Sequence, residues 1–482
     1  MNCIIWHRRD LRTEDNLALK TAEEENKAIL PIFILDPYFF TQFNVCKSRL
    51  IFLFECLEDL NHQYQKLGGK LVIKLGNPIN VLNSLQKELN IEIYANEDTN
   101  TEYGILRDIE VKKMGVRFFK NDAIQREGRK ENWSEEAKKF FESQILQIKK
   151  IKFIEYTQNE NEINKIQKLR NSLKPDKETQ EKGGSTSAQN RLNEFIKILK
   201  YYPKSISKPS LCEDGYTSRL SAHFSFGTIS LKRVYQEVQK TKIKQREFFI
   251  SRLFWNQHFT QKIVKNPQIN KEPSNKIFKE FYDEIYEPNE EIFEKWKSGQ
   301  TGYPLVDASM RALNKTGFLN FRMRAMVASF LTYILKQPWY WGADYMFSQL
   351  MDADFGINYS QWQMQTGMVG VHPNRIYNPT KQILEHDEEC IFIKRHVKEL
   401  ENTPIHLISV DPEEQSIFEW QYIKPIVKFS ERSKWARETY HKINKVAFEY
   451  LQNNQNVVAN LGLEEVSKNR LNKNQLPETK IV

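Results

Sequence analysis

The chain has 482 residues. A single hydrophobic core seldom supports a chain of this length, so we expect two domains. Hydrophobic residues make up 40% and charged residues 28% of the sequence, and no apolar run is long enough to span a bilayer. The five cysteines form no CxxC pair and no Cys/His cluster, so we expect neither a metal site nor a disulfide framework. The net charge of +9 suits a polyanionic partner, although an ordinary solvated basic surface gives the same balance.

Residues 1–125 alternate short apolar runs with helical stretches, which predicts an α/β domain with a doubly wound parallel sheet. The expected strands are 3–8, 29–35, 70–75, 91–96 and 116–121. The first strand leads into Arg8-Arg9-Asp10-Leu11-Arg12, at the edge where such sheets bind ligands. The absence of GxGxxG and GxxxxGK[ST] motifs argues against an ordinary dinucleotide or P-loop site. The N-terminal apolar piece is too short for a signal peptide, so we expect the protein in the cytoplasm, near the nucleoid, or in the nucleus.

The middle of the chain is expected to connect two domains. Residues 126–190 are polar and lysine-rich, and Gly183-Gly184-Ser185 interrupts their helical pattern before an amphipathic helix at 188–199. From 191 to 460 helical periodicity dominates, which predicts a mostly α-helical second domain. Its longest expected helices cover 231–265, 290–315, 318–337, 341–351 and 430–452. The low hydrophobicity of residues 461–482 predicts a disordered tail.

Three segments of the second domain carry candidate binding chemistry. The hydroxyls of Thr217, Ser218 and Ser221, together with Arg219, open a helix and offer donors to a phosphate, although a helix cap with a solvated arginine is the more common reason for such residues. Arg322 and Arg324 lie two positions apart, so they cannot share one helix face, and an inward arginine needs an acidic or phosphate partner. The third segment, 351–364, contains paired carboxylates that offer such a partner or serve as helix caps.

Taken together, five ordered motifs resemble the photolyase/cryptochrome family. WHRRDLRTEDNLAL (6–19) is similar to the family's opening signature. Four further segments are similar to its flavin-domain signatures and occur in the same order: TSRLSAHFSFGTIS (217–230), TGYPLVDASMRAL (301–313), SQLMDADFGIN (348–358) and NRIYNPTKQ (374–382). The resemblance covers nearly the whole chain and implies an N-terminal α/β domain, in some members with an antenna pigment, and a helical C-terminal domain that binds FAD.

The resemblance also implies roles for individual residues. The phosphates of FAD would be held by Thr217, Ser218, Arg219, Leu220 and Ser221. Arg324 would lie over the flavin ring and pair with Asp352, while Asp354 would lie near the ring and Asn358 would face flavin N5. Trp362 and Trp339 match the first two members of the family's electron relay, and Tyr286 falls at the third position.

The expected activity is that of a DNA photolyase, a carbon–carbon lyase that repairs pyrimidine dimers in DNA with light. An asparagine at position 358 is typical of photolyases in this family, and its neutral amide cannot deliver a proton as a carboxylic acid can. Arg322 and Arg375 match the family's DNA phosphate contacts. We expect a monomer that needs no membrane and no metal.

The lesion-contacting pattern departs from the family. Its Glu-x-x-Trp-Arg motif reads Arg252-Leu-Phe-Trp255-Asn256, the next helix carries Phe321 and Ala325, the second tryptophan of a WxW pair is Met364, and the loop 365–374 is shortened. One hypothesis is a photolyase with a rebuilt pocket, in which Trp255, Phe321 and Met364 stack on a flipped dimer. Arg252 would then stabilise negative charge on the pyrimidine, or only contact a phosphate or an acidic neighbour.

The alternative hypothesis is a cryptochrome-like blue-light photoreceptor without repair activity. The sequence also leaves the identity of the antenna pigment undecided, because Gly104 occupies the position of the family's folate-binding glutamate. A folate, a deazaflavin, a flavin and an empty site are all compatible with the sequence.

Overall fold

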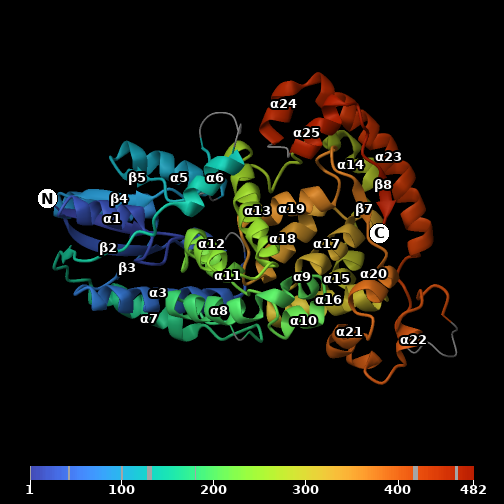
Figure 1. The fold of residues 1–482 in the computed structure, drawn as a ribbon, viewed down its shortest axis with the longest axis horizontal. Helices are drawn as coiled ribbons and strands as arrows, with labels where there is room; N and C mark the ends of the chain where they lie inside the picture. The colour runs from blue at the N-terminus through green and yellow to red at the C-terminus, as the bar shows by residue number, and fades with distance from the viewer. Residues whose placement is uncertain are drawn as a thin grey trace. The chain divides into compact units, whose positions relative to one another are not determined.

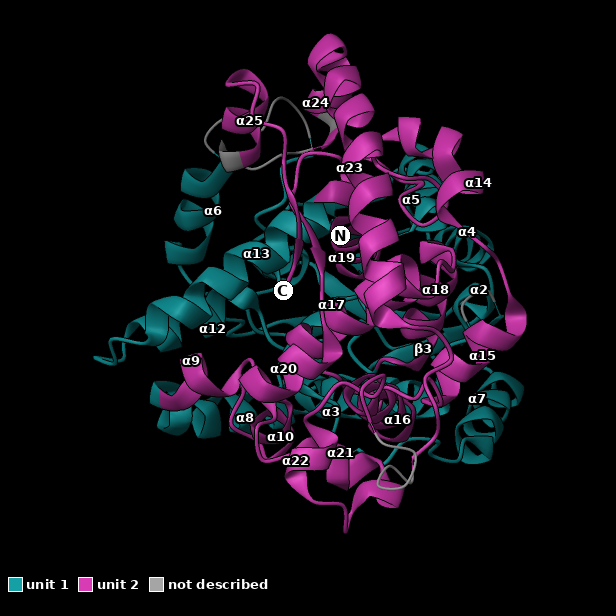
Figure 2. Cartoon of the chain, turned by 90° about the vertical axis from the view of Figure 1, so that its right-hand side faces the viewer, with its two compact units in different colours: residues 1–200, 218–261, 351–354 teal, residues 201–217, 262–350, 355–482 magenta. Residues whose placement is uncertain are grey.

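The computed structural model describes residues 2–41, 44–98, 101–126, 133–179, 181–415, 422–461 and 465–482 (Figure 1). Two compact units, coloured in Figure 2, make up the chain: unit 1 is 1–200, 218–261 and 351–354, and unit 2 is 201–217, 262–350 and 355–482. This division differs from the expected domains 1–125, 126–190 and 191–460, because the connector and the first helices after it belong to the unit that contains the sheet.

Unit 1 contains the expected parallel sheet. Its strands follow the order β3-β2-β1-β4-β5, with the additional strand β6 paired to β2. Their bounds are Asn2–His7 (β1), Ala28–Leu35 (β2), Val72–Leu75 (β3), Glu92–Asn96 (β4), Arg117–Phe119 (β5) and Lys152–Phe153 (β6). The first five agree closely with the expected strands, and their order confirms a doubly wound α/β sheet.

Helices cover both faces of this sheet. The helices of unit 1 are α1 (Leu17–Glu24), α2 (Pro37–Thr41), α3 (Lys47–Lys66), α4 (Pro78–Leu89), α5 (Glu102–Lys113), α6 (Trp133–Glu142), α7 (Glu160–Ser172), α8 (Ser185–Ile198), α11 (Ser221–Phe226), α12 (Leu231–Gln239) and most of α13 (Arg246–Lys265). The connector is therefore partly helical. Its Gly183 lies so close to α3 that a Cβ there would fall 2.3 Å from the backbone oxygen of Phe52, which explains the glycine before α8.

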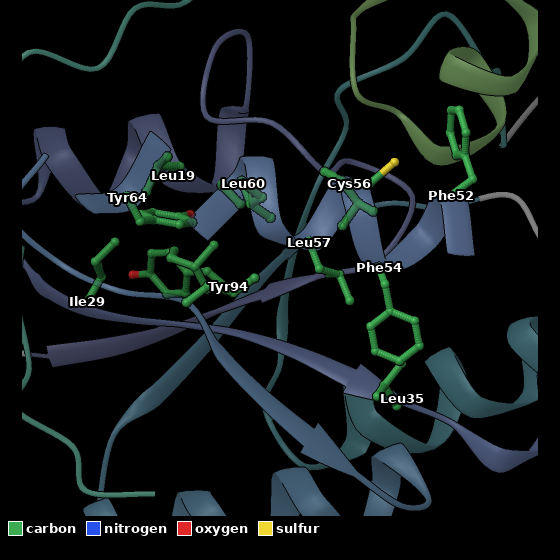
Figure 3. Packing of buried hydrophobic residues seen from close by; sticks show 14 of the residues in the cluster. Leu19, Ile29, Leu35, Phe52, Phe54, Cys56, Leu57, Leu60, Tyr64 and Tyr94 are labelled. Atoms are coloured by element: carbon green, nitrogen blue, oxygen red, sulfur yellow. The ribbon is translucent and has the colours of Figure 1, made fainter. Parts of the chain in front are cut away.

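Alternate residues of the strands point to opposite faces and build two separate cores. On one face Cys3 and Ile5 of β1 pack with side chains from α1 and α3, as Figure 3 shows for Leu19, Leu60 and Tyr64. On the other face Ile4 and Trp6 pack with side chains from α4 and α5. Burial on both faces explains why these strands read as continuous apolar runs.

Unit 2 is mostly helical, as expected. Its helices are α9 (Tyr202–Ser205), α10 (Pro209–Glu213), α14 (Tyr282–Ile285), α15 (Glu290–Ser298), α16 (Pro304–Thr316), α17 (Phe321–Ser329), α18 (Trp339–Gln349), α19 (Phe355–Gln365), α20 (Pro379–His386), α21 (Ile391–His396), α22 (Ile405–Ile408), α23 (Phe429–Asn453), α24 (Gln455–Leu461) and α25 (Glu465–Asn472). The helix expected over 318–337 is shorter, because α17 passes into a π-helical turn at Phe330–Ile334 and Lys336 has a positive φ.

The C-terminal segment differs from the disordered tail that the sequence predicts. The structure has α25 there, followed by strand β8 (Thr479–Ile481), which pairs in parallel with β7 (Asn374–Ile376). Leu461 and Leu471 are buried in an apolar cluster with Phe448 of α23. The composition does not predict this ordered structure. A few buried apolar side chains and a short backbone pairing with the distant strand β7 are enough to order a segment of this length.

Three properties of the described residues concern membranes, disulfides and metals. No helix among them is long and apolar enough to cross a membrane. All five cysteines are buried and free. In the described part of the chain no cluster of three or more His, Cys, Asp or Glu side chains is placed to hold a metal ion.

Candidate functional site

Arginines of unit 1 bind the segment 351–354, which contains Asp352 and Asp354. Arg9 donates from Nε to Asp98 at 3.0 Å and from Nη1 to Asp354 at 2.7 Å. Arg49 of α3 donates to the backbone oxygen of Ala353 at 2.6 Å. Burial alone would raise the pKa of Asp98, but the charges of the neighbouring arginines, Arg9 first among them, hold that pKa below its usual value. Asp352 and Asp354 thus lie on a segment fixed within unit 1.

The predicted phosphate segment begins α11, as the sequence suggests. Ser221 is the first residue of that helix, and the hydroxyl of Ser218 accepts the N–H of Leu220 at 3.5 Å. Arg219 has a φ of 53° and donates from Nε to Glu181 at 2.7 Å. Glu181 therefore engages this guanidinium, and a role for Arg219 in phosphate binding stays a prediction. Leu220 is buried, while Thr217 belongs to unit 2.

Helix α13 presents the residues that replace the family's lesion contacts. Arg252 and Trp255 lie three residues apart, on the same side of the helix. Trp255 is half-buried, and its ring stacks on Phe259 with 5.4 Å between ring centroids. Arg252 is exposed and makes no ion pair with any residue that the structure describes. The guanidinium is therefore available to a bound molecule.

Helix α17 carries the two predicted arginines of unit 2. Arg324 is half-buried and donates from Nε to the backbone oxygen of Leu319 at 2.6 Å. Arg322 lies over the ring of Tyr377 at 5.6 Å from its centroid. The two side chains thus have different surroundings, as their spacing predicts. Because Asp352 belongs to unit 1, its pairing with Arg324 stays a prediction. Phe321 is 49% exposed, whereas Ala325 is buried.

Helix α19 fixes the predicted flavin-facing amide. Asn358 is buried, and its Nδ2 donates to the backbone oxygen of Ala343 in α18 at 3.0 Å. One N–H of the amide is used in this bond, so the orientation of the group is set before any ligand binds. Met364, near the end of the same helix, is half-buried.

The first predicted relay tryptophan packs on a residue that the sequence reasoning did not select. Trp362 meets Trp296 edge to face, with 6.2 Å between ring centroids, and both rings are buried. A Cβ on Gly342 would lie 2.3 Å from the Trp362 ring, so this glycine makes room for the indole. From Trp296 the aromatic contacts continue through Phe293 to the half-buried Trp341, at 5.8 Å and 5.3 Å.

The other two predicted relay residues belong to a second aromatic group. The indole N–H of Trp339 donates to the hydroxyl of Tyr282 at 3.2 Å, and the ring of Tyr282 lies 5.1 Å from that of Tyr286. Tyr286 is buried, and burial raises its pKa well above the usual value. No ring contact joins Trp362 to Trp339 among the described residues. The sequence analysis did not select Trp296 or Tyr282. The number of aromatic residues within a few helical turns of the predicted relay residues was a signal that could have indicated them.

Arg375, the second predicted phosphate contact, projects from β7. Its side chain is exposed, while the neighbours Asn374 and Ile376 are buried. The hydroxyl of Ser329 in α17 donates to the backbone oxygen of Arg375 at 3.0 Å. The strand is thus anchored by its backbone and its two flanking side chains, which leaves the guanidinium at the surface.

The carboxyl edge of the sheet is rich in aromatic and charged side chains. Tyr38 stacks on Tyr103 with 3.8 Å between ring centroids, and Tyr103 donates to Asp36 at 2.7 Å. Gly104 lies in the first turn of α5, capped by the hydroxyl of Thr101. This position supplies no carboxylate for a folate held in the family's manner, and an antenna in unit 1 stays a prediction.

Comparisons with known proteins agree with the motifs. A family model described as DNA photolyase matches residues 3–122, and one described as the FAD binding domain of DNA photolyase matches residues 249–442; together they cover more than half of the chain. A deoxyribodipyrimidine photo-lyase from a Synechococcus species is 27% identical over 476 residues, which cover 91% of this chain and 96% of the relative. A cryptochrome DASH from Gloeobacter violaceus is 28% identical over 440 residues, with coverages of 83% and 86%.

Solved structures give the same result. The crystal structure of an archaeal photolyase from Sulfolobus tokodaii, described as containing two FAD molecules, superposes with a TM-score of 0.73 and 28% identity. The match covers 92% of this chain and 100% of that one. The similarity to this photolyase structure therefore extends over most of the chain.

Each unit, taken by itself, carries side chains whose chemistry suits FAD. In unit 1 the hydroxyls of Ser218 and Ser221 stand at the start of α11, where donors suit a phosphate. In unit 2 Asn358 supplies an amide whose orientation Ala343 fixes, and Arg324 supplies a half-buried cation. Hydroxyls, an amide and a cation are the donors that a diphosphate and an electron-rich flavin ring require. With its fold, its ordered motifs and the two matched domains, the chain belongs to the photolyase/cryptochrome family of FAD-binding flavoproteins.

Proposed function

We propose that this protein uses FAD and light to split pyrimidine dimers in DNA, as a deoxyribodipyrimidine photolyase. The observation that carries the proposal is the pair Arg252 and Trp255 on one side of α13, with the guanidinium exposed and the indole half-buried. A cation and a flat aromatic ring are the two surfaces that a damaged, unstacked pyrimidine pair needs. When bound, FAD supplies the electron that light makes available.

With the flavin already reduced, the proposed repair causes no net oxidation or reduction. One electron is lent to the dimer, the two carbon–carbon bonds between the pyrimidines break, and the electron is returned. Arg252 would stabilise the transient negative charge on a pyrimidine carbonyl, because a fixed cation interacts most strongly where charge develops. Asn358 is a neutral amide held in place by Ala343, so it places no additional negative charge beside an electron donor.

Unit 2, taken by itself, also presents apolar side chains at positions that the family resemblance links to the lesion. Phe321 is exposed at the first turn of α17, and Met364 is half-buried on α19. Such surfaces accept a base by stacking and offer few hydrogen bonds to select it. We therefore expect weak discrimination between lesions and a preference for single strands, in which flipping a base costs less.

A second candidate function is that of a blue-light photoreceptor without repair activity. The observation that favours it is the burial of Ala325, which stands where the family's cyclobutane enzymes carry a lesion-contacting side chain. A buried methyl group cannot bind a lesion. The similarity to a cryptochrome DASH, at 28% identity, is compatible with either function.

Illumination of the fully reduced protein with dimer-containing DNA separates the two functions. Repair predicts that intact pyrimidines appear only in the light, with single-stranded DNA as the better substrate. Unchanged dimer content in both forms of DNA would favour the photoreceptor instead.

A further inference from the structure

The C-terminal segment of unit 2 folds onto the strand that carries Arg375. β8 lies beside β7 (Figure 1). The two strands are parallel, and Lys480 is the registered partner of Arg375. The N–H of Asn378 donates to the backbone oxygen of Val482 at 2.7 Å, which extends the ladder beyond the two strands. The segment is therefore bound along its length to the residues that follow α19.

Side chains reinforce this backbone pairing. Val369 and Val371, in the loop before β7, are buried in one apolar cluster with Leu461 and Leu471. The hydroxyl of Ser467 in α25 lies 3.3 Å from Nδ1 of His372. The loop and the C-terminal segment thus share one small core, and that core fixes where the surface residues of both project.

The register places two cations side by side. Partners in adjacent strands project to the same face of a sheet, so the side chains of Arg375 and Lys480 are neighbours. Both are exposed. The ammonium of Lys480 lies 2.6 Å from Glu478, whose side chain is 70% exposed, and a pair this accessible to water exchanges readily for another anion.

A third cation joins them from α25. Arg470 lies three residues after Ser467, on the side of α25 that meets His372. Burial lowers the pKa of His372 to about 3, with further lowering by the charges of Lys262, Arg470 and Arg375. This histidine is therefore neutral at physiological pH, and the positive charge of the area comes from lysine and arginine side chains contributed by separate segments.

We propose that α25 and β8 complete a surface for the DNA phosphate backbone, with Lys480 and Arg470 as phosphate contacts beside Arg375. The proposal rests on the DNA-directed function above and extends it to a segment outside the matched flavin domain. Clustered cations bind a polyanion because its condensed counterions are released. One guanidinium group can also donate two parallel hydrogen bonds to two oxygens of a phosphate. The net charge of +9 makes an anionic partner the favourable one.

The test is the salt dependence of DNA binding by the purified flavoprotein, measured by fluorescence anisotropy with a labelled dimer-containing oligonucleotide. Lys480→Gln and Arg470→Gln should each lower the log–log salt slope by about 1, and the double variant by about 2. Lys468→Gln is the matched control, because Lys468 is exposed on the same helix one position after Ser467, on a different side. Its slope should equal that of the wild type.

Glu478→Gln gives a result of opposite sign. It frees Lys480 and removes a negative charge beside the phosphates, so binding should tighten. Wild-type slopes for both cation variants, together with a reduced slope for Arg375→Gln, would overturn the contact with the C-terminal segment and leave DNA binding in place. Failure of the wild type to bind DNA in a salt-dependent manner would overturn the DNA-directed function itself.

Discussion

Arg9 donates to Asp354 at 2.7 Å and so joins the end of the first strand to a segment 345 positions later in the chain. The same guanidinium donates to Asp98 after β4. The side chain of Arg9 is 27% exposed, and those of Asp98 and Asp354 are 8% and 13% exposed. One partly buried cation therefore binds two carboxylates, and through Asp354 it fixes residues 351–354 within unit 1.

Arg9→Gln should lower the free energy of unfolding by about 1–3 kcal/mol, because two largely buried carboxylates lose a charged donor. The measurement is a urea titration at neutral pH. Arg170→Gln is the control, since Arg170 pairs with Glu58 where both side chains are about half exposed, and its loss should cost less than about 1 kcal/mol. Equal effects of the two variants would mean that the Arg9 bridge contributes no more than a surface ion pair.

The same variant should change the acid limb of stability. The folded-state pKa of Asp98 is held below its ordinary value of 3.8, so its contribution is complete above that pH and is lost as the pH falls through the lower folded value. The difference between wild type and Arg9→Gln should therefore narrow below about pH 4. A difference that stays constant from neutral pH to about pH 3 would show that Asp98 is not coupled to Arg9.

The purified protein should release FAD, and not FMN, when it is denatured, which chromatography of the supernatant measures. Ser218→Ala and Ser221→Ala should each weaken FAD retention by about 10-fold or more, because a hydrogen bond to a charged phosphate is worth about 1.5–3 kcal/mol. Ser172→Ala is the control, since that hydroxyl is exposed and only donates to the backbone of Leu169. A protein that holds no FAD even after reconstitution would contradict the assignment.

Blue light with an external reductant should bleach the oxidised flavin absorption, and Trp362→Phe should slow this sharply. Trp339→Phe should slow it as well, as the relay prediction requires. The ring contact between Trp362 and Trp296 adds the expectation that Trp296→Phe also slows it. Trp435→Phe is the control, because Trp435 contacts Lys336 and Tyr440 and lies outside both aromatic groups. Unchanged rates in Trp362→Phe and Trp339→Phe would reduce both residues to core packing.

The strands β1 to β5 were predictable because each is a buried apolar run between helix-length segments. Strands β6 and β8 were not, since Lys152–Phe153 and Thr479–Ile481 are too short for any side-chain period and form by pairing with β2 and β7. Long apolar runs therefore predicted strands correctly, whereas strands of two or three residues that depend on a distant pairing partner could not be predicted from the sequence.

The residues of the candidate site also differ in how far the sequence predicted them. Motif spacing identified Asn358, and the structure gives its amide a fixed partner in Ala343. Spacing could not show that Arg219 meets Glu181, since the two residues are separated by a stretch with no periodic link. The same limit applies to Arg9 and Asp354, whose bridge depends on how the chain folds back on itself.

The most direct test of the account is a count of pyrimidine dimers after illumination of the fully reduced protein with dimer-containing DNA, single- and double-stranded, against a dark control. We predict light-dependent loss of dimers, faster in single strands. Arg252→Ala should lower the rate of repair at saturating DNA more than it weakens binding, if the guanidinium acts on the charged pyrimidine. Lys244→Ala, an exposed residue just before α13, should repair at the wild-type rate. Dimer content that is the same in light and dark for the wild-type protein, with either form of DNA, would contradict the photolyase function.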